Sequence, residues 1–128
     1  MPPATDPSAR AHSSRDIPGK LIPGKLLRLL IWESDRYQGK PLYEAIVAKC
    51  RELKIAGASV FLGLEGYGET AEMHRAHLVR SDRPVLINIV DTAESIARLS
   101  PVVEEMIDTG LIAASDVQMV RVEKDSAE

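Results

Sequence analysis

The chain has 128 residues, 45% of them hydrophobic, and a formal net charge of −3. This size fits one small globular domain, and the mildly acidic balance gives no reason to expect a nucleic-acid partner. No segment reaches the about 18 consecutive apolar residues of a membrane span. The N-terminus also lacks a basic region followed by an apolar stretch, so we expect a cytoplasmic protein that does not insert into a membrane.

The first 24 residues are expected to form a disordered tail, because they contain five of the eight prolines and show no hydrophobic period. A tandem repeat ends this tail: Ile17-Pro-Gly-Lys-Leu21 is followed by Ile22-Pro-Gly-Lys-Leu26. A local duplication is the favoured interpretation of the repeat, and a partner-binding motif is the alternative. The folded domain is expected to cover residues 25–122, and a polar C-terminal tail residues 123–128.

The next segments predict a strand, a loop and a helix. The apolar run over residues 26–32 has the length of a buried strand, and residues 42–57 carry apolar side chains at helical spacing after Pro41. Residues 33–40 are then a strand-to-helix loop, and the helix N-terminus at its end favours anions. An ordinary solvated loop is the alternative interpretation. The lone Cys50 lies on the apolar stripe of the helix, so we expect it to be buried and inert.

The second half of the chain predicts two strands, a helix and a last strand. The strands are rich in β-branched or large apolar residues. The helix has a start resembling a capping box at residues 91–94, a glycine stop at Gly110, and a kink or restart at Pro101. The predicted elements are strands over residues 58–65 and 85–90, a helix over residues 91–110 and a strand over residues 117–122.

This order predicts an α+β ferredoxin-like βαββαβ sandwich, in which two helices cover one face of a four-stranded antiparallel sheet. The strands over residues 26–32 and 85–90 have large apolar residues at both odd and even positions, so both faces of the sheet require burial. Exposing several of them, at about 1.5 to 3 kcal/mol each, exceeds the stability margin of a small domain. We therefore predict a homo-oligomer with its sheets facing inward. Alternatively, the N-terminal tail covers the open face.

The connection from Gly63 to Pro84 is far longer than the about 2 to 5 residues of a usual hairpin loop. Its glycines allow backbone N–H groups to converge on an anion, and basic residues follow. It matches no phosphate-binding fingerprint, and an extended hairpin whose glycines relieve bulges is an equal alternative. His74 and His77 also have a spacing that metals accept, without a clear third ligand. The glycines are Gly63, Gly66 and Gly68, and the basic residues are His74, Arg75, His77, Arg80 and Arg83.

Two segments together resemble the domain of unknown function 190 family, which is similar to the PII signalling proteins. They are residues 33–43 and 56–68, followed by His74 and by the stretch Arg80-Ser-Asp-x-Pro84. The resemblance covers about residues 25–122. It implies a ferredoxin-like subunit assembled as a homotrimer, with small effectors, often adenine nucleotides, in clefts between subunits. It also implies a loop after the second strand that contacts a partner such as a membrane transporter.

The chain departs from the family pattern in two places. Leu62 stands where we expect a basic residue and Asn88 where we expect an acidic one, so an ion pair between their strands should be missing. Residues 108–116, where PII proteins have a phosphate loop, contain no lysine. The expected effector is therefore a smaller or different nucleotide than ATP held in the PII manner.

The leading hypothesis is a regulatory, non-catalytic sensor of a small anionic effector, with an adenine nucleotide as the expected ligand. Arginine and lysine would pair with phosphate or carboxylate, and Tyr67 would stack on a base. An intersubunit salt-bridge set of Glu33, Arg36 and Lys40 is the alternative. A metal-responsive trimer using His74 and His77, or a ligand-free structural adaptor, stays open. No catalytic residue and no metal site are predicted, and the predicted ligand-binding residues are Glu33, Ser34, Asp35, Arg36, Lys40, Gly63, Gly66, Tyr67, Gly68, His74 and Arg80.

Overall fold

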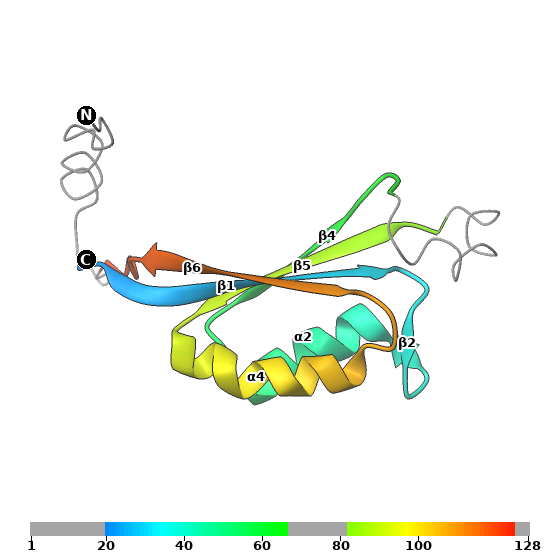
Figure 1. Ribbon diagram of the computed structural model, residues 1–128, viewed down its shortest axis with the longest axis horizontal. Coiled ribbons are helices and arrows are strands. Elements are labelled where there is room, and N and C mark those ends of the chain that lie inside the picture. The colour runs from blue at the N-terminus through cyan, green and yellow to red at the C-terminus, as the bar shows by residue number, and fades with distance from the viewer. Residues whose placement is uncertain (1–19, 67–81, 125–128) are drawn as a thin grey trace, which may run out of the picture.

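The computed structural model describes residues 20–66 and 82–124, which form a twisted four-stranded sheet with two helices on one face (Figure 1). The strand order is β4-β5-β1-β6 and every pair is antiparallel. The predicted ferredoxin-like α+β fold is confirmed. The sheet contains β1 (Ile22–Trp32), β4 (Ala58–Leu62), β5 (Pro84–Asp91) and β6 (Leu111–Met119), the helices are α2 (Leu42–Glu52) and α4 (Ala93–Met106), and a small hairpin consists of β2 (Arg36–Tyr37) and β3 (Lys40–Pro41).

The core lies between the sheet and the two helices. Alternate residues of the central strands β1 and β5 point to the helices, because side chains along a strand alternate between the two faces. The helices meet them with apolar residues at helical spacing. The buried residues are Leu27, Leu29 and Ile31 of β1, Val85, Ile87 and Ile89 of β5, Leu42, Ile46 and Cys50 of α2, and Ile96, Leu99, Val103 and Met106 of α4.

No helix among the described residues is long and apolar enough to cross a membrane.

The two strands at the ends of the chain are longer than predicted. β1 begins at Ile22, so residues 22–24, assigned above to the tail, belong to the sheet and pair with residues 117–119 of β6. The second copy of the repeat is therefore the first part of β1. β6 covers Leu111–Met119 rather than residues 117–122, because its small and polar residues carry a weak strand signal and backbone pairing with β1 decides its extent.

Both helices also differ in their ends. α2 ends at Glu52, before the predicted end near Gly57. The N-cap of α4 is Thr92, whose hydroxyl accepts from Ser95 N at 3.2 Å. Of the two effects predicted for Pro101, a kink or a restart, the restart is wrong, since α4 is one helix with Pro101 inside it. α4 also ends at Met106, before the predicted stop at Gly110.

The hairpin β2–β3 lies within the segment predicted to be a loop. Its turn residues Gln38 and Gly39 have φ angles of 51° and 81°. Positive φ at both central positions characterises a type I′ turn, whose twist matches that of paired strands. The polar pair Gln-Gly between short flanking segments was the signal that the sequence interpretation missed. The hairpin lies directly before α2 and beside the helix layer (Figure 1).

Candidate functional site

The loop after β1 is hydrogen-bonded to Asp82 and Arg83, the two residues directly before β5. Glu33 N donates to Arg83 O at 2.8 Å. Ser34 donates twice to the carboxylate of Asp82, from its N to Oδ1 at 3.1 Å and from its Oγ to Oδ2 at 2.8 Å. Asp82 thus holds a loop that lies far from it in the sequence, and two predicted site residues, Glu33 and Ser34, are fixed relative to β5.

Two glycines after β4, Gly63 and Gly66, contact Pro84, which directly follows Asp82 and Arg83. Gly63 N donates to Pro84 O at 2.8 Å. A Cβ at Gly63 would lie 2.8 Å from Pro84 Cγ, and one at Gly66 would lie 3.1 Å from the same atom. Because Gly63 and Gly66 have no side chain, their backbone can pack closely on Pro84. The N–H of Gly63 is used within the chain, so the predicted role of this N–H in binding an anion does not fit the structure.

Asp35 shapes the loop that carries these residues. Its Oδ2 accepts from Trp32 N at 2.9 Å, and its own N donates to Trp32 O at 3.1 Å. Its carbonyl oxygen accepts from Leu42 N at 2.8 Å, which connects the loop to the first turn of α2. These contacts give Asp35 a structural role at the end of β1.

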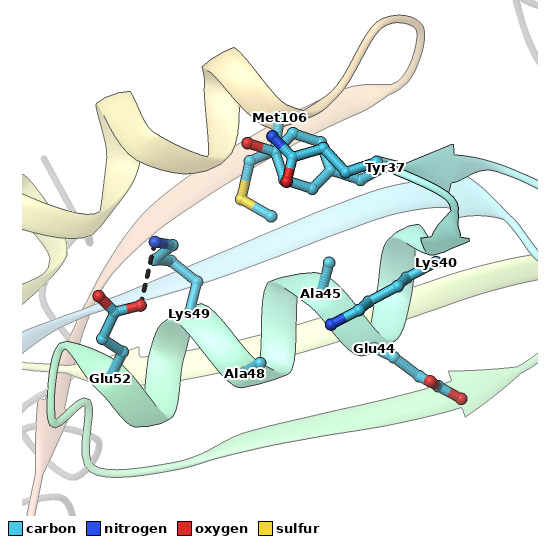
Figure 2. Close-up of a pocket in the computed structure, with 9 residues that line it drawn as sticks. Tyr37, Lys40, Glu44, Ala45, Ala48, Lys49, Glu52 and Met106 are labelled. Carbon is cyan, nitrogen blue, oxygen red and sulfur yellow. Dashed lines mark hydrogen bonds and ion pairs between the residues drawn. The ribbon is translucent and has the colours of Figure 1, made fainter.

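Arg36 and Lys40 lie on the hairpin instead, and both are exposed. Among residues 20–66 and 82–124 neither forms an ion pair. Lys40 lines an open cavity of about 330 Å³ between the hairpin and α2, together with Tyr37 and Met106 (Figure 2). On the far side of this cavity, Lys49 Nζ is paired with Glu52 Oε1 at 3.0 Å.

The predicted site is therefore divided into two groups of residues. Glu33, Ser34, Gly63 and Gly66 contact residues 82–84, whereas Lys40 lies against α2. The sequence interpretation did not include Asp82 or Pro84 in the site, although both belong to the stretch that suggested the family. The remaining predicted residues, Tyr67, Gly68, His74 and Arg80, lie outside the described part of the chain, as does His77.

Within the described residues, no group of three or more His, Cys, Asp or Glu side chains could hold a metal ion. The metal hypothesis rests on His74 and His77, which are not among these residues. It is therefore not tested by the structure.

The expectation about Leu62 and Asn88 needs a correction. Leu62 lies opposite Val85 in the β4–β5 register, whereas Asn88 lies opposite Ser59 on β4 and opposite Arg28 on β1. Because neighbouring residues along a strand alternate between faces, positions 62 and 88 are on opposite faces of the sheet. Residues of opposite charge at these two positions would not form a direct ion pair across the β4–β5 ladder.

The sheet face opposite the helices is apolar and open. Leu30 is 42% exposed, Phe61 50%, Val90 38% and Leu111 56%, and these four residues come from all four strands. The two-sided apolar character predicted from the sequence is confirmed. Residues 20–66 and 82–124 leave this face uncovered, so the homotrimer stays a prediction and the N-terminal tail stays the alternative cover.

The DUF190 family profile, described as uncharacterized ACR, matches residues 24–119. The chain belongs to this family. The membership predicted from the sequence is thus confirmed. Two UPF0166 proteins are similar to this DUF190 chain: one from Aquifex aeolicus, 33% identical over 103 residues, and one from Methanocaldococcus jannaschii, 33% identical over 104 residues. Each alignment covers 79% of this chain, and 97% and 95% of the respective relatives.

Solved structures of PII-like proteins share the fold of this DUF190 chain. CPII from Thiomonas intermedia, bound to ADP, AMP and acetate, has a TM-score of 0.55 and 19% identity, over 80% of this chain and 93% of that one. A PII-like signaling protein from Thermus thermophilus has a TM-score of 0.55 and 14% identity, over 79% and 93%. At these identities the likeness establishes a PII-like fold for the DUF190 chain.

Proposed function

We propose that this DUF190 protein is a non-catalytic, PII-like regulatory protein that binds a small anionic effector, an adenine nucleotide, where its subunits meet. One observation carries the proposal: the loop after β1 and the loop after β4 both contact residues 82–84, next to a sheet face that requires a cover. The same fold in CPII, whose structure contains ADP and AMP, supports it.

The exposed charges on and next to these loops suit a nucleotide. Arg83 belongs to the segment that both loops contact, and Arg36 follows the loop after β1 in the sequence, on the hairpin. A charge-assisted bond from such a cation to phosphate contributes about 1.5 to 3 kcal/mol. The exposed carboxylate of Glu33 is an acceptor for hydroxyl groups such as those of a ribose. Since residues 108–116 lack lysine, AMP or ADP fits the proposal better than ATP.

The first experiment measures the mass of the full chain in solution by size-exclusion chromatography with light scattering. We expect a trimer formed through the open sheet face. Leu30→Lys adds a second cation to this face, on the same side of β1 as Arg28, and should give monomers. The control is Val122→Lys, at an exposed apolar residue outside the sheet, which should leave the mass unchanged. A monomeric wild type would contradict the proposed assembly and would favour the N-terminal tail as the cover.

The second experiment tests the effector by thermal shift and calorimetry with AMP, ADP, ATP, cyclic AMP and cyclic di-AMP. We expect AMP or ADP to raise the melting temperature, and Arg36→Ala to weaken binding at least about tenfold. Arg98→Ala, an exposed arginine of α4, is the matched control and should bind normally. Uniformly flat curves would contradict effector binding and favour a ligand-free adaptor. The membrane transporter as regulated partner stays a prediction.

A further inference from the structure

One row of the open sheet face has polar residues on both central strands. The strand register places Ser59 of β4, Asn88 of β5, Arg28 of β1 and Ala113 of β6 side by side. The flanking open-face positions on the central strands are apolar: Leu26 and Leu30 on β1, and Leu86 and Val90 on β5.

The two strongly polar members of this row, Asn88 and Arg28, have no side-chain partner among residues 20–66 and 82–124. Asn88 Oδ1 is buried and has no hydrogen-bond partner among the described residues. Arg28 is exposed and, in that same part of the chain, forms no ion pair. Buried polar atoms in native proteins are nearly always hydrogen-bonded, so an orphan carbonyl oxygen beside an unpaired guanidinium requires an explanation.

The charges of the face limit what can cover it. Between residues 20–66 and 82–124, the open face carries Arg28 but no acidic residue. A second copy of the same face therefore brings no carboxylate to Arg28. Burying a guanidinium without an acceptor is costly, and a neutral acceptor already present on the face reduces that cost.

We propose that Asn88 is this acceptor: when a second copy of the chain covers the open face, Arg28 donates to Asn88 Oδ1 across the β1–β5 pair. Directly opposite residues of an antiparallel pair have Cβ atoms about 4.5 to 5.5 Å apart, well within the reach of arginine. The pair satisfies both groups and forms the polar centre of an otherwise apolar self-interface. This inference rests on the self-assembly proposed above and specifies which residues determine its strength.

The test compares four variants of the full chain by the concentration at which the assembly dissociates, measured by light scattering and mass photometry. Asn88→Leu leaves Arg28 buried without an acceptor, so the dissociation concentration should rise at least about tenfold. Arg28→Leu/Asn88→Leu removes the buried charge and should restore or exceed wild-type assembly. Asn88→Asp supplies a carboxylate and should assemble at least as tightly as wild type. Arg98→Leu on α4 is the matched control. Circular dichroism and urea unfolding show that each variant is folded.

The outcomes separate this inference from the assembly itself. If the wild type assembles but Asn88→Leu dissociates no more readily than Arg98→Leu, the pairing of Arg28 with Asn88 is wrong and the self-assembly stands. If the double variant is no better than Asn88→Leu, the loss does not come from an unpaired Arg28, and the inference is again overturned. A wild type that is monomeric at all concentrations would overturn both.

Discussion

Ser34 and Asp82, 48 residues apart in the chain, are joined by two hydrogen bonds to the two oxygens of one carboxylate. Asp82→Ala removes both bonds, and we expect the free energy of unfolding to decrease by about 1 to 2 kcal/mol. Nucleotide binding should weaken as well, because the loop after β1 loses its connection to β5. Urea unfolding and calorimetry measure the two effects.

The control for this variant is Asp116→Ala. Asp116 also forms a close polar contact, with Lys25 Nζ at 2.7 Å, but its side chain is largely exposed and lies away from residues 82–84. Removing such a surface pair should change stability little. If Asp82→Ala behaves like Asp116→Ala in both measurements, the Ser34–Asp82 contact does not organise the site.

Asp91 is a buried carboxylate that connects two parts of the fold. Its Oδ2 accepts from Ala56 N at 2.8 Å and its Oδ1 from Thr92 N at 2.7 Å. Asp91→Ala leaves both N–H groups without their acceptor, and we expect a loss of about 2 to 4 kcal/mol in the free energy of unfolding. Asp91→Asn keeps one acceptor oxygen and should lose less. Equal losses for the two variants in urea unfolding would contradict this account.

Gly39 and Gly57 form a matched pair for testing the hairpin turn. A Cβ at either position meets no heavy atom within 4 Å, but only Gly39 has a positive φ, of 81°. Gly39→Ala should therefore destabilise the protein by about 1 to 2 kcal/mol through backbone strain alone. Gly57→Ala should be neutral or slightly stabilising. Thermal and urea unfolding of the two variants check this difference, and equal effects would argue against the type I′ turn.

Burial raises the pKa of the Cys50 thiol from 9.0 to about 11. The unfolded chain therefore ionises at lower pH than the folded one, so this contribution to stability is complete below pH 9 and is lost as the pH rises to about 11. At pH 10 the loss is about 1 kcal/mol.

Urea unfolding at several pH values, compared between wild type and Cys50→Ala, isolates this effect from the other groups that titrate at high pH. The variant should lack the additional decrease above pH 9. Native Cys50 should also react slowly with a thiol reagent at about pH 8, and fast once urea unfolds the chain. Rapid reaction of the folded protein would show that the thiol is accessible.

The fold could be predicted from the sequence because its strongest apolar patterns set local strand or helix structure and also contribute residues to the core. Leu27, Leu29 and Ile31 of the apolar run are buried because they face the helical stripe that contains Ile46 and Cys50. β6 was misplaced because an edge strand with small and polar residues is stabilised by backbone pairing with β1, which leaves no hydrophobic period to detect.

The candidate site was harder to predict, because its geometry depends on contacts between segments far apart in the chain. Arg36 and Lys40 have the charges expected of an anion site, but the turn at Gln38 and Gly39 directs this segment into a hairpin, and Lys40 lies beside α2. Asp82 holds the loop after β1 through two hydrogen bonds from Ser34, which lies 48 residues earlier. Composition and spacing contain no information on such a pair.

The pentapeptide duplication at the start of β1 raises the question of whether the strand could shift by one repeat. Such a shift would place Pro23 at the position of Arg28, between two neighbouring strands, where proline cannot donate to the ladder. It would also place Gly24 at the position of Leu29, which is fully buried, and so empty the centre of the core. The duplicated residues therefore offer the chain no second alignment, and folding selects a single one despite the local ambiguity.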